Sequence, residues 1–130
     1  MDDVSKLLSN PTATHVAIVG ATDSPGKWGG RAYRDLKGKG FRVSAVNPGA
    51  VTVDGDSSVA SVADLTEAPD LVVFVVPPSA TLSILEECLR LGYVNVWIQP
   101  GAADDAVRAF LDDNAFNAIV DACILVETAA

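Results

Sequence analysis

Short apolar runs recur along the chain and alternate with longer segments of mixed polarity. The runs lie at residues 15–19, 42–46, 71–76, 94–98 and 117–121. Their apolar side chains follow one another without a regular polar face, which is typical of strands buried on both sides in a parallel sheet. The pattern therefore predicts five parallel strands.

The segments between these runs carry the spacing and the stop residues of helices. They predict helices at residues 2–9, 28–37, 59–65, 79–91 and 103–113, with an Asp-, Ser- and Gly-rich loop at 54–58. Because strand and helix alternate, we expect an α/β fold with a doubly wound, Rossmann-like, five-stranded parallel sheet in the order 3-2-1-4-5. The 130 residues suit a single domain, in which residues 1–13 form an N-terminal helix and linker.

A ligand site is expected at the carboxyl edge of this sheet. In doubly wound folds, ligands bind where the strand order reverses, which in this order falls between the first and fourth strands. The loop that starts at Gly20 would then meet the Gln-Pro-Gly sequence at residues 99–101. The ends of two further strands, Asn47-Pro48-Gly49 and Val76-Pro77-Pro78, would lie beside them.

The loop at residues 20–30, GATDSPGKWGG, joins the first strand to a helix. Glycines let the backbone approach a phosphate, and the free N–H groups of a helix N-terminus attract anions. Lys27 adds a positive charge at that point. The loop therefore indicates a nucleotide-type ligand held by its phosphates, although its glycines do not follow Gly-x-Gly-x-x-Gly. The alternative is a strand-to-helix turn that requires glycine for its geometry alone.

The charge distribution favours a small anionic ligand. The net charge is −8, yet residues 27–42 hold six basic side chains against one acid, Asp35. An otherwise acidic chain argues against nucleic acid, which requires a broad basic face. Lys27 is the best-placed phosphate contact and Arg31 a further one, whereas Arg34 is expected in solvent about 10 Å beyond Lys27.

Composition excludes several other classes of protein. No apolar run approaches the roughly 18 residues of a membrane span, and the acidic N-terminus lacks the basic start of a signal peptide. Cys88 and Cys123 lie in apolar stretches without a Cys-x-x-Cys motif, so buried thiols in a reducing cytoplasm are expected. His15 has no companion at metal-ligand spacing, so no metal site is expected. The abundance of Asp over Glu and the few lysines suit either high salt or an ordinary protein of low pI.

The end of the second strand narrows the choice of nucleotide. NAD-binding folds usually place Asp or Glu there to hold the ribose hydroxyls, whereas this chain has Asn47 followed by Pro48. No Walker A sequence is present, so hydrolysis of ATP or GTP is not expected. These features disfavour NAD and nucleoside triphosphates.

Three motifs resemble those of small bacterial and archaeal CoA-binding proteins. They are Gly-Ala-Thr-Asp-Ser-Pro-Gly-Lys at residues 20–27, Arg-Val-x-x-Val-Asn-Pro at 42–48 and Asp-x-Cys-Ile-x-Val-Glu at 121–127. The chain is also similar to the N-terminal domain of the succinyl-CoA synthetase alpha subunit and of ADP-forming acyl-CoA synthetases. Two features differ: Ala50 stands where the synthetases have a ligand-contacting lysine, and the sequence has no counterpart of their phosphohistidine domain.

The resemblance implies that CoA binds in the crevice at the carboxyl edge. The backbone of residues 20–24 and Lys27 would hold its phosphates, and residues 76–78 would flank the adenine or ribose. Two alternatives stay open, since Pro77-Pro78 also suits the start of a helix and Trp28 could stack on a ring or pack within the protein or an interface. The residues expected to bind the cofactor are Gly20, Ala21, Thr22, Ser24, Lys27, Trp28, Arg31, Asn47, Pro48, Val76, Pro77, Pro78, Gln99 and Gly101.

The sequence favours non-enzymatic binding of CoA or a short acyl-CoA. No nucleophile adjoins a general base in the sequence, so no catalytic residue is expected, and Asp121 and Glu127 are expected to be solvated. The alternative is an NAD(P)-linked or acyl-transferring enzyme, or one subunit of such an enzyme. A homo-oligomer or a partner acyl-CoA enzyme stays open for either function.

Overall fold

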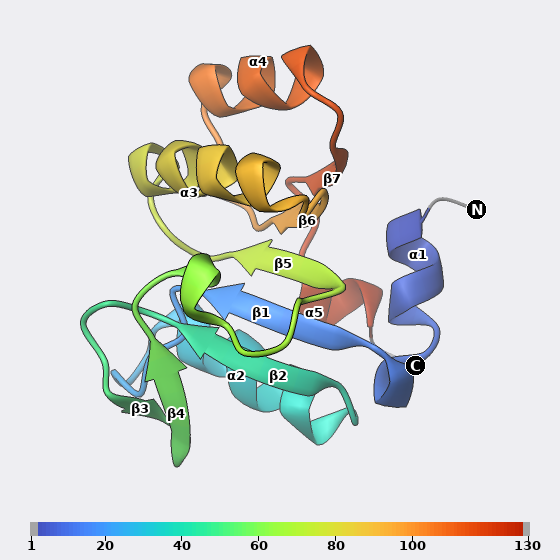
Figure 1. The fold of residues 1–130 in the computed structure, drawn as a ribbon. Coiled ribbons are helices and arrows are strands. Elements are labelled where there is room, and N and C mark those ends of the chain that lie inside the picture. The colour runs from blue at the N-terminus through green and yellow to red at the C-terminus, as the bar shows by residue number, and fades with distance from the viewer. Residues whose placement is uncertain (1–2, 129–130) are drawn as a thin grey trace.

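Seven strands form one sheet with helices on both faces in the computed structural model, which describes residues 3–128 (Figure 1). Their spatial order is β3-β4-β2-β1-β5-β6-β7, and every neighbouring pair is parallel except β3 and β4. The strands are β1 His15–Val19, β2 Arg42–Val46, β3 Thr52–Val53, β4 Asp56–Val59, β5 Leu71–Phe74, β6 Asn95–Ile98 and β7 Asn117–Val120.

The predicted strand order is wrong for the strand at residues 71–76. That strand is β5, and it pairs with β1, with Val16 opposite Leu71, rather than with β2. The place beyond β2 is taken by β4. Numbered in chain order, the six parallel strands follow 3-2-1-4-5-6, the arrangement of dinucleotide-binding doubly wound folds. The strand order therefore reverses between β1 and β5, and not between β1 and β6.

Strand β4 lies in a segment predicted to be a loop and the start of a helix. Its sequence, Asp-Ser-Ser-Val, is too polar to show the pattern of a buried strand. A turn at Asp54 and Gly55, both with positive φ, joins it antiparallel to β3. The Asn47 N–H donates a hydrogen bond of 2.8 Å to the Val59 carbonyl, which aligns β4 with the end of β2. The helix predicted at 59–65 is only a 3-10 turn, η2 Val62–Asp64.

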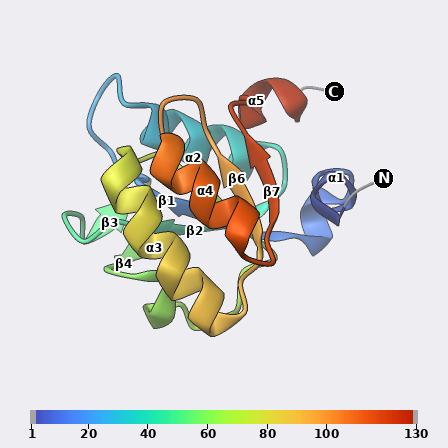
Figure 2. The same ribbon diagram turned by 90° about the horizontal axis from the view of Figure 1, so that it is seen from above.

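Two groups of helices cover the two faces of the sheet (Figure 2). Helices α3 Pro78–Leu91 and α4 Asp105–Asp113 lie on one face, and α1 Asp3–Leu8, α2 Trp28–Gly38 and α5 Ile124–Glu127 lie on the other. The helices predicted at 28–37, 79–91 and 103–113 are confirmed to within two residues. Helix α1 matches the one predicted at 2–9, of which Asp2 lies outside the described residues. Helix α5 and the 3-10 turn η1 Pro11–Ala13 have no predicted counterpart.

The central strand β1 supplies side chains to both cores. Val16 and Ile18 belong to the cluster that contains Tyr33 of α2, and Val19 to the cluster that contains Leu85 of α3. Burying one such large apolar side chain contributes about 1.5–3 kcal/mol. This burial on both faces explains why the strand sequence is uniformly apolar. It also holds the carboxyl end of β1, from which the glycine-rich loop starts, in a defined position.

His15 and Cys88 are structural residues. The His15 Nε2 lies 2.6 Å from the Ser44 Oγ, and its Nδ1 lies 3.2 Å from the Ala68 carbonyl oxygen, at the amino end of β1. Burial raises the pKa of the Cys88 thiol to about 12, which disfavours the thiolate form. No helix within residues 3–128 is long and apolar enough to cross a membrane.

Candidate functional site

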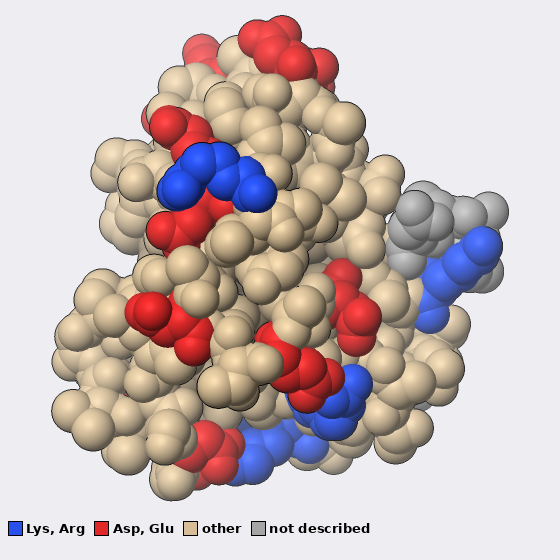
Figure 3. All heavy atoms as spheres, viewed as in Figure 1, with Lys and Arg blue, Asp and Glu red and all other residues tan. Residues whose placement is uncertain are grey.

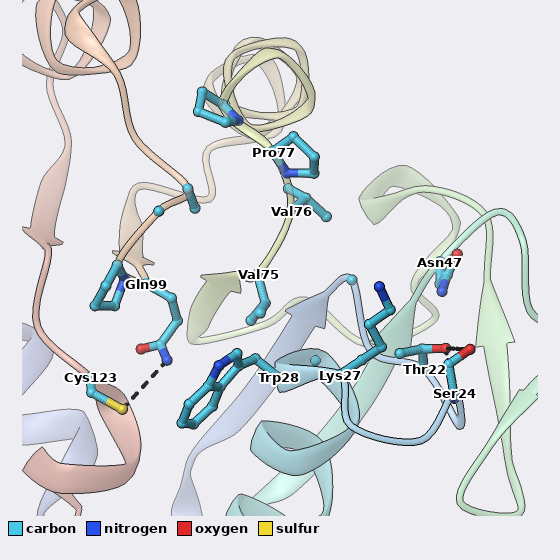
Figure 4. A pocket seen from close by; sticks show the side chains of 16 residues that line it. Thr22, Ser24, Lys27, Trp28, Asn47, Val75, Val76, Pro77, Gln99 and Cys123 are labelled. Atoms are coloured by element: carbon cyan, nitrogen blue, oxygen red, sulfur yellow. Dashed lines mark hydrogen bonds between the residues drawn. The ribbon is translucent and has the colours of Figure 1, made fainter.

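An open cavity of about 820 Å³ lies at the carboxyl edge of the sheet, where the strand order reverses (Figure 4). Its walls come from the β1–α2 loop, the end of β2, the β5–α3 connection, the β6–α4 loop and the residue that precedes α5. The lining residues are Gly20, Thr22, Ser24, Lys27, Trp28, Gly29, Asn47, Val75, Val76, Pro77, Pro78, Gln99, Pro100, Gly101, Ala102 and Cys123.

Most residues predicted to bind the cofactor line this one cavity; Ala21, Arg31 and Pro48 do not. The lining also contains residues that the sequence reasoning did not select: Gly29, Val75, Pro100, Ala102 and Cys123. The first four adjoin predicted residues and could have been found by extending the same loops. Cys123 belongs to the motif at residues 121–127, but its place at the cavity depends on how the chain returns after β7.

Glycines allow the β1–α2 loop to pack tightly against α2 and β5. Gly20 has a φ of +97°, and a Cβ there would lie 2.3 Å from the Val75 carbonyl oxygen. A Cβ on Gly29 would lie 1.9 Å from the Gly20 carbonyl oxygen. Gly20 and Gly29 are therefore needed for the geometry of this strand-to-helix turn, whether or not the loop also binds a phosphate. The same packing places the first turn of α2, which no side chain caps, against the cavity.

Asn47 anchors this loop from the end of β2. Its Nδ2 donates a 2.9 Å hydrogen bond to the Ala21 carbonyl, and its Oδ1 accepts a 2.8 Å hydrogen bond from the Gly49 N–H. The side-chain amide thus has a partner at both atoms. Asn47 lines the cavity as a positioning residue that holds the loop and the turn together.

Three cations predicted as part of the basic segment are neutralised by acids. Lys37 lies 3.1 Å from the Asp54 carboxylate and 2.8 Å from that of Asp56. Hydrogen bonds from Lys37 and Tyr33 hold the pKa of Asp56 below its usual range. Lys39 pairs with Asp35, and Arg42 pairs with Glu67.

The remaining cations of that segment, Lys27, Arg31 and Arg34, are on or just before α2. Lys27 lines the cavity, and no acidic side chain among residues 3–128 pairs with Lys27, Arg31 or Arg34. The Arg31 guanidinium lies 4.8 Å from the centroid of the Trp28 ring, and Trp28 is 53% exposed at the cavity. This edge of an acidic molecule is therefore locally positive.

The wall opposite the glycine-rich loop is formed by β5–α3 and β6–α4. Pro77 occupies the N-cap of α3 and Pro78 its first position, so the helix-start role of this pair is confirmed while both residues also line the cavity. Gln99 is only 4% exposed, and its Oε1 accepts a 2.7 Å hydrogen bond from the Ile124 N–H. Its Nε2 lies 3.7 Å from the Cys123 Sγ. Gln99 thus ties the C-terminal segment to this wall.

The two acids near the last strand are both on the surface. Asp121 is exposed and pairs with Arg108, and Glu127 is exposed. Within residues 3–128, no three His, Cys, Asp or Glu side chains gather in a group that could hold a metal ion. The cavity therefore offers glycine-loop backbone, uncompensated cations and apolar walls, which suit binding of a phosphorylated ligand with apolar parts.

Comparisons with known proteins find relatives in both sequence and structure. An ADP-forming acetate–CoA ligase of Methanocaldococcus jannaschii is 34% identical over 87 residues, which are 67% of this chain but only 12% of the ligase. A solved structure of a conserved hypothetical protein from Pyrococcus furiosus is 37% identical, with a TM-score of 0.84, and the match covers 88% of this chain and 98% of that one.

A larger enzyme shares the fold. The dinucleotide-forming acetyl-coenzyme A synthetase 1 of Candidatus Korarchaeum cryptofilum has a TM-score of 0.73 at 24% identity, over 93% of this chain and 28% of the synthetase. The family model described as a CoA binding domain matches residues 14–129, which include every residue that lines the cavity. The chain belongs to the CoA binding domain family.

Proposed function

We propose that this chain binds CoA, or a short acyl-CoA, in the cavity at the carboxyl edge of the sheet. The observation that carries the proposal is the uncapped N-terminus of α2, which meets a glycine-rich loop and the unpaired Lys27 at a cavity of about 820 Å³. Membership of the CoA binding domain family supports the choice of CoA among phosphorylated ligands.

The proposed contacts divide the ligand between two walls. The glycine-rich loop, the N–H groups of the first turn of α2 and the Lys27 ammonium face the phosphates, where they provide charge-assisted hydrogen bonds. Residues 76–78 on the other wall provide apolar surface for the adenine. The rest of the cavity, toward Gln99–Ala102 and Cys123, leaves room for the pantetheine arm.

A second function has support from one comparison. The chain would act as the CoA-binding part of an acyl-CoA enzyme, with the reaction supplied by a partner, because an acetate–CoA ligase contains a 34% identical segment. The chain spans only 12% of that ligase, so any ligase activity lies with other domains or other proteins. In both functions, this chain contributes the binding of CoA.

A calorimetric titration with CoA, acetyl-CoA, NAD, NADP and ATP tests the proposal. We expect CoA or acetyl-CoA to bind most tightly, because Asn47 replaces the acid that would hold an unphosphorylated ribose. The purified chain alone is expected not to release thiol from acetyl-CoA. Binding of NAD as tight as that of CoA would overturn the proposal, whereas thiol release that a Lys27→Glu variant abolishes would show that the chain also acts as an enzyme at this cavity.

A further inference from the structure

We propose that Arg34 makes the cavity selective for a ligand with a phosphorylated ribose, so that CoA is distinguished from dephospho-CoA by its 3′-phosphate. This inference rests on the proposed function and names the part of CoA that Arg34 recognises. It gives a specificity role to a side chain that the sequence predicted to be merely solvated.

Positive charge without an acidic partner is concentrated at the start of α2. Lys37, Lys39 and Arg42 are paired with acids, whereas the described residues provide no acidic partner for Lys27, Arg31 or Arg34. A ribose phosphate adds about −1.5 to −2 charges to a ligand that already carries a diphosphate. Three neighbouring cations therefore match CoA better than they match dephospho-CoA.

Arg34 turns back along α2 toward the glycine-rich loop. A Cβ built on Gly30 would lie 2.2 Å from the Thr22 carbonyl oxygen and 3.0 Å from the Arg34 Nη1. The Arg34 guanidinium and the Thr22 carbonyl therefore both lie next to Gly30. Thr22 lines the cavity, whereas Arg34 lies just outside the lining. The guanidinium is thus beside the loop, at the rim of the open cavity, even though the Arg34 backbone lies in the second turn of the helix.

Arg31 points to a different part of the site. Its guanidinium stacks on Trp28, and Figure 4 shows Trp28 on one side of Lys27 with Thr22 and Asn47 on the other. Arg31 has the same charge and lies on the same helix, three residues from Arg34. Substitution of Arg31 removes the same charge at a different position, so it is a matched control for the effect of substituting Arg34.

The end of β2 is suited to a phosphorylated ribose. Doubly wound folds bind the ribose there, with a carboxylate for free hydroxyls or an arginine nearby for a ribose phosphate. This chain has the neutral Asn47, whose amide is already bonded to Ala21 and Gly49. The acid within the loop, Asp23, accepts a 2.8 Å hydrogen bond from the Asp54 N–H, which directs its carboxylate toward the β3–β4 turn.

The test compares CoA with dephospho-CoA by calorimetry on the full chain and on three variants. In the unsubstituted protein, we expect CoA to bind at least about tenfold more tightly, the size expected for one charge-assisted contact. Arg34→Gln is expected to bring this ratio close to one while dephospho-CoA affinity stays the same. Arg31→Gln is expected to keep the ratio, and Lys6→Gln, on α1, to keep both affinities.

Each outcome separates the inference from the proposed function. If the unsubstituted protein binds both ligands equally, or if Arg31→Gln lowers the ratio as much as Arg34→Gln does, the role of Arg34 is wrong while CoA binding stands. If neither ligand binds, the proposed function is wrong. The dephospho-CoA affinity of Arg34→Gln also reports whether that variant retains an intact cavity.

Discussion

Lys27 is the residue on which the proposed phosphate site depends most directly. It lines the cavity at the N-terminus of α2 and has no acidic partner within the described residues. Lys27→Glu replaces attraction by repulsion, and loss of a charge-assisted contact costs roughly 1.5–3 kcal/mol. We expect the CoA affinity measured by calorimetry to fall at least about tenfold. The Tm of the free protein should change little, because Lys27 is exposed.

The control for this substitution is Lys6→Glu, which makes the same change of charge on α1, beside the amino end of β1 (Figure 1). Lys39, at the other end of α2, is less suitable because it pairs with Asp35 and donates a hydrogen bond to Thr128. Equal losses from Lys27→Glu and Lys6→Glu would mean a long-range effect of charge. No loss from Lys27→Glu would make the loop a purely structural turn.

The partners of individual side chains could not be predicted from the sequence. Residues 27–42 can be recognised from the sequence as the basic part of an acidic chain. The sequence does not reveal which of these cations lack an acidic partner. Arg42 pairs with Glu67 and Lys37 pairs with Asp54, and both acids lie well beyond their partners along the chain. The hydrogen bonds of Asn47 to Ala21 and of Gln99 to Ile124 likewise depend on the folded arrangement.

Docking of α2 onto the β1–α2 loop is the element-scale feature that shapes the cavity. A Cβ on Gly29 would lie 1.9 Å from the Gly20 carbonyl oxygen, so Gly29→Ala forces α2 away from the loop. We expect a loss of about 1–3 kcal/mol in the free energy of unfolding, measured in urea, and weaker CoA binding. Gly38→Ala, in the same helix with no atom within 4 Å of its Cβ, should be neutral or stabilising by up to about 1 kcal/mol. Equal effects of the two substitutions would contradict this account.

Elements with a strong local pattern could be predicted, and those without one could not. The apolar runs and the capping glycines located five parallel strands and three long helices to within about two residues. The polar β4 is held in place by its partner β2, and the short α5 lies next to the Gln99 side chain. Their positions are determined by tertiary contacts rather than by local sequence.

The whole-molecule error in strand order has the same cause. The sequence pattern does not predict β4, so it places the strand at residues 71–76 beside β2. The predicted reversal of strand order then falls between β1 and β6 instead of between β1 and β5. The cavity still lies at the predicted edge, because the carboxyl ends of all parallel strands meet at one edge whatever their order. For that reason most of the lining residues could be predicted to lie together even though the predicted strand order was wrong.

Charge is also a property of the whole molecule. The net charge is −8, and the acids at both ends of α4 gather on the surface at the top of Figure 3. Asp112 and Asp113 stand in the last turn of that helix, where the helix dipole also disfavours negative charge. Folding brings these charges together, so their repulsion destabilises the compact state.

Screening this repulsion should stabilise the protein. The Debye length falls from about 30 Å at 0.01 M salt to about 8 Å at 0.15 M, so we expect Tm to rise between 0.01 M and 0.3 M NaCl. The double variant Asp112→Asn, Asp113→Asn should have the higher Tm at low salt and a smaller gain on adding salt, because two of the repelling charges are gone. Salt also weakens surface ion pairs such as Lys37–Asp56. A Tm that falls over this range would show that these pairs outweigh the net repulsion.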